Sequence, residues 1–168
     1  METVRHPKPD PVGPGQESAW DYPRPPRLDR SPELVEVHLG GVVVARSSAT
    51  MRVLETSHPP TYYLPRSAFD EGVLRPVAGT SWCEWKGEAG YFDLVAGGRT
   101  AERAAWTYPH PTPGFEALLD HLAVMPATVD ACYVDGERVV PQAGGFYGGW
   151  VTSRVAGPFK GGPGSWGW

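Results

Sequence analysis

The side chains with the widest chemical capacity lie in the segment SWCEWKGEAGYFDL, residues 81–94, which holds a thiol, two indoles, an ammonium and three carboxylates. A thiol acts as a nucleophile when a base or a positive charge favours its thiolate form. Cys83 is therefore a candidate nucleophile, with His58 and His110 available as bases in proline-rich turns. Their spacing does not show that they meet, so a buried, inert thiol is the alternative.

Aromatic residues recur with a period of two in this segment and in a later one. Successive side chains of a strand point to opposite faces of a sheet. We therefore expect Cys83 and Trp85 on one face of their strand, with the residues flanking Cys83 on the other. Trp106 and Tyr108 share a face of the later strand in the same way. With Tyr63, these side chains would form the aromatic wall of a pocket.

Two opposite charges stand at the ends of expected strands, Glu55 and Lys86. A lysine and a carboxylate among indoles form either a solvated, salt-bridged strand end or a desolvated pair with shifted pKa values. If they converge on the aromatic wall, they would orient the polar end of a ligand. The candidate ligand-binding residues are Glu55, Tyr63, Cys83, Trp85, Lys86, Trp106 and Tyr108.

The spacing of possible ligands argues against a metal site. The two cysteines, Cys83 and Cys132, form no Cys-x-x-Cys pair, and the five histidines are scattered along the chain. The glycine-rich loops of common nucleotide-binding proteins are missing as well. We expect neither a metal nor a cofactor.

Charge and hydropathy restrict the partners. The 15 basic and 19 acidic residues give a net charge of −4 without a long run of either sign, which argues against binding to nucleic acid. No apolar run approaches the roughly 20 residues of a membrane-spanning helix, so we expect no membrane partner. No apolar signal region stands at the beginning of the sequence, so we expect a cytoplasmic protein.

The composition predicts a mainly β fold, because 21 Gly and 19 Pro accompany seven Trp and seven Tyr. The folded body is expected over residues 33–141. Its expected strands cover residues 34–39, 42–45, 50–55, 61–64, 81–85, 91–95 and 103–108, with a closing hairpin at 132–140. One α-helix is expected over residues 115–124, where apolar residues recur on one helical face. That face consists of Phe115, Leu118, Leu119 and Leu122.

Two extended arms flank this body. Residues 1–32 are proline-rich, and residues 142–168 alternate glycine with aromatic residues. Disorder is one interpretation of both segments. The other is that their rings, including Trp20 and Tyr22, dock on the body or on a second subunit, because large aromatic side chains are costly to leave in water. Docking on a second subunit would make the protein a homodimer.

Four segments resemble the family known as domain of unknown function 427. They are LETSHPPTYYLP at residues 54–65, CEWKG at 83–87, AWTY at 105–108 and YVDG at 133–136. The resemblance runs in order over about residues 34–140, and the Cys-x-x-Lys-Gly and Trp-x-Tyr elements are its most specific parts. The flanking arms resemble those of actinobacterial members, which are bacterial proteins.

The resemblance implies a compact, single-domain β-tent of the Mss4-like type, in which antiparallel sheets meet over a pocket. Many β-tents hold zinc on paired Cys-x-x-Cys knuckles, a pattern that this chain lacks. The family is also catalogued as nucleotidyltransferase-like. Phosphoryl transfer of that kind usually needs clustered carboxylates that hold magnesium.

We therefore predict a small-molecule-binding domain whose aromatic pocket carries the charges of Glu55 and Lys86. The alternative is an enzyme that uses the same pocket. There Lys86 or Cys83 would attack a substrate or Glu55 would move a proton, and the family name suggests a nucleotidyltransferase-like activity.

Overall fold

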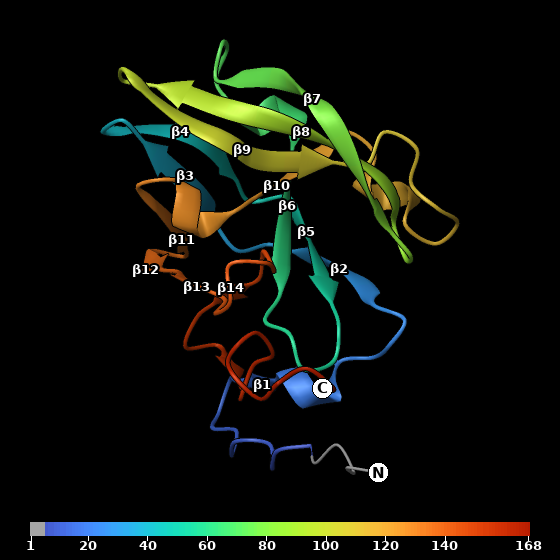
Figure 1. Cartoon of the computed structure of the whole chain (residues 1–168). Helices are drawn as coiled ribbons and strands as arrows, with labels where there is room; N and C mark the ends of the chain where they lie inside the picture. Colours follow the sequence, from blue (N-terminus) through green and yellow to red (C-terminus); the bar gives the residue numbers. More distant parts are fainter. Residues whose placement is uncertain (1–5) are drawn as a thin grey trace.

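The computed structural model describes residues 6–168, which form a mainly β structure (Figure 1). The mainly β expectation is thus confirmed, while the first five residues of the expected arm lie outside the described part. The strands are β1 (Glu17–Ser18), β2 (Arg27–Ser31), β3 (Val35–Leu39), β4 (Val42–Ser47), β5 (Thr50–Leu54), β6 (Thr61–Pro65), β7 (Leu74–Cys83), β8 (Gly87–Ala96), β9 (Arg99–Thr107), β10 (His121–Val124), β11 (Ala131–Val134), β12 (Glu137–Arg138), β13 (Val140–Pro141), β14 (Trp150–Val151) and β15 (Val155–Ala156).

The largest sheet has seven strands in the order β2-β5-β6-β10-β9-β8-β7, and every neighbouring pair is antiparallel. Directly opposite residues of paired strands share a face. The register therefore places one row of side chains across five strands, namely Met51, Tyr63, Ala123, Trp106 and Tyr91. This row supplies much of the aromatic wall described below.

The opposite face of the seven-stranded sheet packs against a four-stranded sheet of order β12-β11-β3-β4. Tyr62 and Leu64 of β6 point into the core between the sheets, where they join Val35 and Val37 of β3. Tyr63 lies between them in sequence and belongs to a separate apolar cluster on the other face. All three β6 residues are buried because this sheet is covered on both faces.

The α-helix expected over residues 115–124 is wrong. The chain forms one 3-10 turn, η3 (Glu116–Leu118), and then the strand β10 between β6 and β9. The helical geometry ends at Leu119, whose ψ of 134° is extended, and Asp120 follows with φ 57°. Leu119 is 50% exposed instead of lying on a buried helical face. The apolar run in β10 is buried on both sides of a central strand, a pattern that short stretches share with helices.

The other helical segments of residues 6–168 are also single 3-10 turns: η1 (Ala19–Asp21), η2 (Arg66–Ala68) and η4 (Pro126–Thr128). No helix in this part of the chain is long and apolar enough to cross a membrane.

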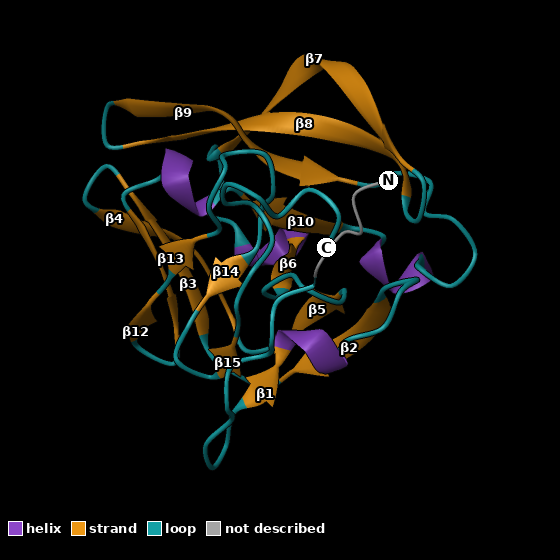
Figure 2. Cartoon of the chain, turned by 60° about the horizontal axis from the view of Figure 1, so that its bottom comes forward, coloured by secondary structure: helices purple, strands orange, loops and turns teal. Residues whose placement is uncertain are grey.

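The described parts of both arms pack on the body. The end of the N-terminal segment forms β2, an edge strand of the large sheet. In the tail, Trp150 is fully buried and its indole nitrogen donates to the carbonyl oxygen of Val124 at 3.1 Å. Figure 2 shows β14 between β13 and β6, and β15 beside β1 of the opposite arm, with which it pairs. Assembly into a homodimer through these segments stays a prediction.

The N-terminal arm and the tail also contact each other. The indole nitrogen of Trp20 donates to the carbonyl oxygen of Pro158 at 2.9 Å, and the Trp20 ring meets the edge of Trp168 at 5.6 Å. Tyr22 is buried, and its hydroxyl donates to Glu17 at 2.7 Å. Both rings of the N-terminal arm therefore have partners within the same chain.

Candidate functional site

A pocket of about 490 Å³ opens over the aromatic face of the seven-stranded sheet. Its walls come from β5, β6 and β9, from the turn that follows β7, and from the tail. All of the sequence-predicted site residues line this one pocket: Glu55, Tyr63, Cys83, Trp85, Lys86, Trp106 and Tyr108. Residues separated by as many as 53 positions in the chain, from Glu55 to Tyr108, thus meet at one site.

Tyr63 lies at the base of the aromatic wall. Its ring is fully buried, 6.5 Å from Trp106 in an edge-on arrangement and 6.3 Å from Tyr108 between ring centroids. Burial raises the pKa values of Tyr63 and Tyr108, so both phenols stay protonated near neutral pH. Within residues 6–168, the Tyr63 hydroxyl has no hydrogen-bond partner.

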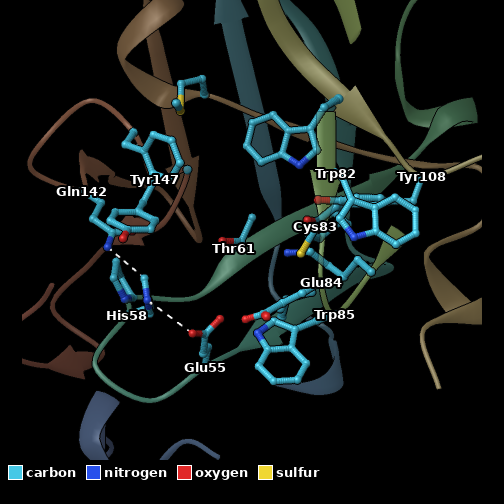
Figure 3. A pocket seen from close by; sticks show the side chains of 18 of the residues that line it. Glu55, His58, Thr61, Trp82, Cys83, Glu84, Trp85, Tyr108, Gln142 and Tyr147 are labelled. Carbon is cyan, nitrogen blue, oxygen red and sulfur yellow. Dashed lines mark hydrogen bonds and ion pairs between the residues drawn. The ribbon is translucent and has the colours of Figure 1, made fainter. Parts of the chain in front are cut away.

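The turn after β7 brings further aromatic and charged groups to the pocket. The strand ends at Cys83, so the alternation expected through Trp85 is wrong, and Glu84 and Trp85 lie in the turn before β8. Thr112 fixes this turn, because its hydroxyl donates to the carbonyl oxygen of Trp85 and its amide donates to that of Lys86. Trp82 and Glu84, expected on the far face, line the pocket too (Figure 3).

Glu55 and Lys86 line the same pocket without forming an ion pair with each other. Glu55 instead pairs with Arg24 of the N-terminal arm at 3.0 Å. The Lys86 ammonium lies over the rings of Tyr63 and Tyr108, 6.0 and 5.5 Å from their centroids. Such contacts stabilise a cation without neutralising its charge.

His58 lies between Glu55 and Gln142 of the tail. Its Nε2 lies 3.6 Å from a carboxylate oxygen of Glu55, and its Nδ1 lies 3.1 Å from the amide nitrogen of Gln142 (Figure 3). Burial, together with the positive charges of Lys160, Arg24 and Lys86, lowers the pKa of His58 to about 4, although Glu55 opposes the shift. The imidazole is therefore neutral at pH 7.

The tail closes one side of the pocket, and the sequence did not predict this position. Tyr147 meets His58 edge-on at 4.8 Å, and Lys160 and Gln142 line the same wall. Gly148 lies against the Trp106 ring so closely that an added Cβ would come within 2.2 Å of Cη2. The alternation of glycine and aromatic residues indicated that the tail packs on the body or on a partner. It did not indicate that the tail lines the pocket.

The candidate nucleophile has little support from its surroundings. Cys83 is half-buried in the pocket wall, and no hydrogen bond among the described residues joins it to His58 or His110. His58 lines the pocket, whereas His110 does not. Over residues 6–168, no three side chains of His, Cys, Asp or Glu are grouped so as to hold a metal ion.

A family model described as domain of unknown function (DUF427) matches residues 27–135, more than half of the chain. The chain belongs to the DUF427 family. The matched region runs from β2 to the end of β11 and contains all of the predicted site residues, so the family resemblance is confirmed. Arg24 and the tail residues of the pocket lie outside the match. A comparison with curated proteins finds no match.

Proposed function

We propose that this DUF427 protein is a small-molecule-binding domain whose ligand occupies the pocket between the aromatic wall and the tail. The observation that carries the proposal is that aromatic and charged side chains from separate strands and turns, among them Tyr63, Trp106, Glu55 and Lys86, meet in the lining of one pocket of about 490 Å³.

The size and the lining of the pocket support the same proposal. Ligand pockets usually measure roughly 300–1,000 Å³ and combine apolar walls with a few polar groups. Here the rings of Tyr63, Trp85 and Trp106 form the apolar part, while Glu55 and Lys86 supply charge. The two sheets that pack beneath this pocket support assignment of the fold to the β-tents.

Catalysis in the same pocket is the second candidate, and it has weaker support. The lowered pKa makes His58 a poor base at neutral pH, and Cys83 has no hydrogen bond to it. Nucleotidyl transfer, which the family catalogue name suggests, usually relies on grouped carboxylates. The carboxylates in this pocket, Glu55 and Glu84, come from separate segments, and Glu55 is already paired with Arg24.

A thermal-shift screen against a metabolite library tests the binding proposal. A ligand at 100 times its Kd stabilises a protein by about 2.7 kcal/mol, so the Tm of a domain of this size should rise by roughly 5–10 °C. We expect the same compounds to stabilise Trp166→Ala, because Trp166 is 93% exposed and lies outside this pocket. They should not stabilise Trp106→Ala. The proposal fails if no compound acts on the wild type or if Trp106→Ala responds equally.

A further inference from the structure

We propose that the ligand is an organic anion with a flat aromatic or conjugated body, whose anionic group lies between the ammonium groups of Lys86 and Lys160. This inference rests on the proposed binding function and specifies the class of ligand.

The first support is the placement of the lysines. The chain has three lysines, and Lys86 and Lys160 both line the pocket, from opposite segments of its wall. The Lys86 ammonium lies over the rings of Tyr63 and Tyr108, whereas that of Lys160 donates to the main-chain oxygen of Trp168 at 3.3 Å and lies 5.8 Å from the centroid of the Tyr147 ring. In the described part of the chain, no Asp or Glu carboxylate lies within 4.0 Å of either ammonium.

The second support is that the other charged groups are either engaged or peripheral. Arg24 neutralises Glu55, and Glu84 is exposed at the rim. The guanidinium of Arg103 stacks on Tyr91 at 4.1 Å and donates to the carbonyl oxygen of Ala78 at 2.9 Å. Among the described residues, no Asp or Glu pairs with either pocket lysine, and the Lys86 ammonium has no hydrogen-bond partner, so the interior of the pocket carries positive charge. Half-buried charges without a partner favour a ligand of opposite sign.

The third support is the behaviour of His58. Lys160, Arg24 and Lys86 all lower its pKa, so the positive potential of both pocket lysines reaches the imidazole. An anion bound between them would offset that potential and raise the pKa of His58. A rise in the pKa of His58 on binding would thus report that the ligand is an anion.

The apolar part of the ligand follows from the rings around these charges. Trp106 and Trp85 flank the interior, and two large rings, Trp82 and Phe146, line the pocket while remaining 73% and 81% exposed. Exposed aromatic side chains at the mouth of a pocket offer faces for stacking on a flat ligand. Since the lysines lie among these rings, the anionic group and the flat body belong to one molecule.

A matched set of probes tests the inference by isothermal titration. The set contains 2-naphthoate and 2-naphthyl phosphate as anions, 2-naphthamide as the neutral analogue and 2-naphthylmethylammonium as the cation. We expect at least one anion to bind about tenfold or more tightly than the neutral and the cationic probe. One charge-assisted hydrogen bond changes affinity by about this factor. Lys86→Gln and Lys160→Gln should each lower that preference about three- to tenfold. Lys8→Gln removes an exposed lysine outside the pocket and should leave it unchanged.

The same set separates failure of the inference from failure of the binding function. Equal affinity for the three classes, with binding lost in Trp106→Ala, overturns the anionic assignment and leaves the pocket as a binding site. An anion preference that persists in both lysine variants overturns it as well. If neither anion binds, the inference is wrong, and the metabolite screen with Trp106→Ala decides the binding function separately. The two anions distinguish a carboxylate ligand from a phosphate ligand.

Discussion

The amide nitrogen of Gln142 lies 3.1 Å from Nδ1 of His58 and 2.7 Å from the carbonyl oxygen of Lys160. The opposite end of this amide accepts from the Gly149 backbone nitrogen at 3.2 Å, so the backbone fixes its orientation. A side-chain amide nitrogen only donates, and Nδ1 of His58 must therefore accept. This assigns the imidazole proton to Nε2, on the side of Glu55. A tail residue outside the family match thus sets the tautomer of a pocket residue.

The neutral state of His58 predicts a pH dependence of stability. Burial lowers the pKa of His58 from 6.5 to about 4, so between these values the unfolded chain binds more protons than the folded one. The contribution to stability is complete above pH 6.5 and falls by roughly 3 kcal/mol as the pH approaches 4. Urea unfolding of the wild type and of His58→Asn, which keeps an acceptor for Gln142 but cannot titrate, isolates this effect. We expect the wild type to lose stability relative to the variant over this range. Parallel pH profiles would contradict the assignment.

The contact between the tail and the aromatic wall predicts a strong effect of one methyl group. In Gly148→Ala the new Cβ would come within 2.2 Å of Trp106, so either the tail or the ring must move. Overpacking of this kind costs about 1–3 kcal/mol and should weaken any ligand that contacts Trp106. Gly162→Ala is the control, because no atom lies within 4 Å of its added Cβ. Equal free energies of unfolding for the two variants would show that the tail does not press on Trp106.

Arg52 anchors the N-terminal segment through two acids. Its guanidinium is largely buried and lies 2.8 Å from Glu17 and 2.9 Å from Asp29. Arg52→Ala removes both pairs together with the packing of the side chain, and we expect a loss of about 2 kcal/mol in the free energy of unfolding. Arg46→Ala removes an exposed arginine of β4 and should change stability by less than about 0.5 kcal/mol. Denaturant titration measures both, and similar losses would contradict the anchoring role.

Binding and covalent catalysis differ in the reactivity that they require of Cys83. Burial raises the pKa of the Cys132 thiol to about 12, so this cysteine should resist iodoacetamide in the folded protein. Cys83 is half-buried and should react first, at a rate no higher than that of N-acetylcysteine at the same pH. Mass spectrometry of Cys132→Ser and Cys83→Ser gives the two rates. Labelling of Cys83 well above the reference rate would instead favour the enzyme.

The sequence predicted the parts of the fold that depend on local signals. The strands expected at residues 34–39, 42–45 and 50–55 correspond to β3, β4 and β5, and β3 and β4 form the first hairpin. The error over residues 115–124 arose because a central strand buried on both faces has no period of two. Only pairing with β6 and β9, which is a tertiary effect, decides between strand and helix there.

The candidate site was predictable where its residues lie on strands. Tyr63 lies on β6 and Trp106 on β9, both within expected strands, and Tyr108 directly follows the end of β9. Gln142, Tyr147 and Lys160 could not be found in this way, because their positions depend on how the tail crosses the body. The partner of Glu55 was missed for the same reason, since Arg24 reaches it from the other arm.

Fluorine NMR of protein labelled with 5-fluorotryptophan tests the central claim most directly, because each of the seven tryptophans reports on its own surroundings. Single Trp→Phe substitutions assign the signals, and pools of small metabolites are then added. Ligand binding in the proposed pocket predicts that the signals of Trp85 and Trp106 shift in a saturable manner, while those of Trp20 and Trp166 stay in place. If no compound moves the Trp85 and Trp106 signals, or if Trp166 responds as strongly as they do, the pocket is not the binding site.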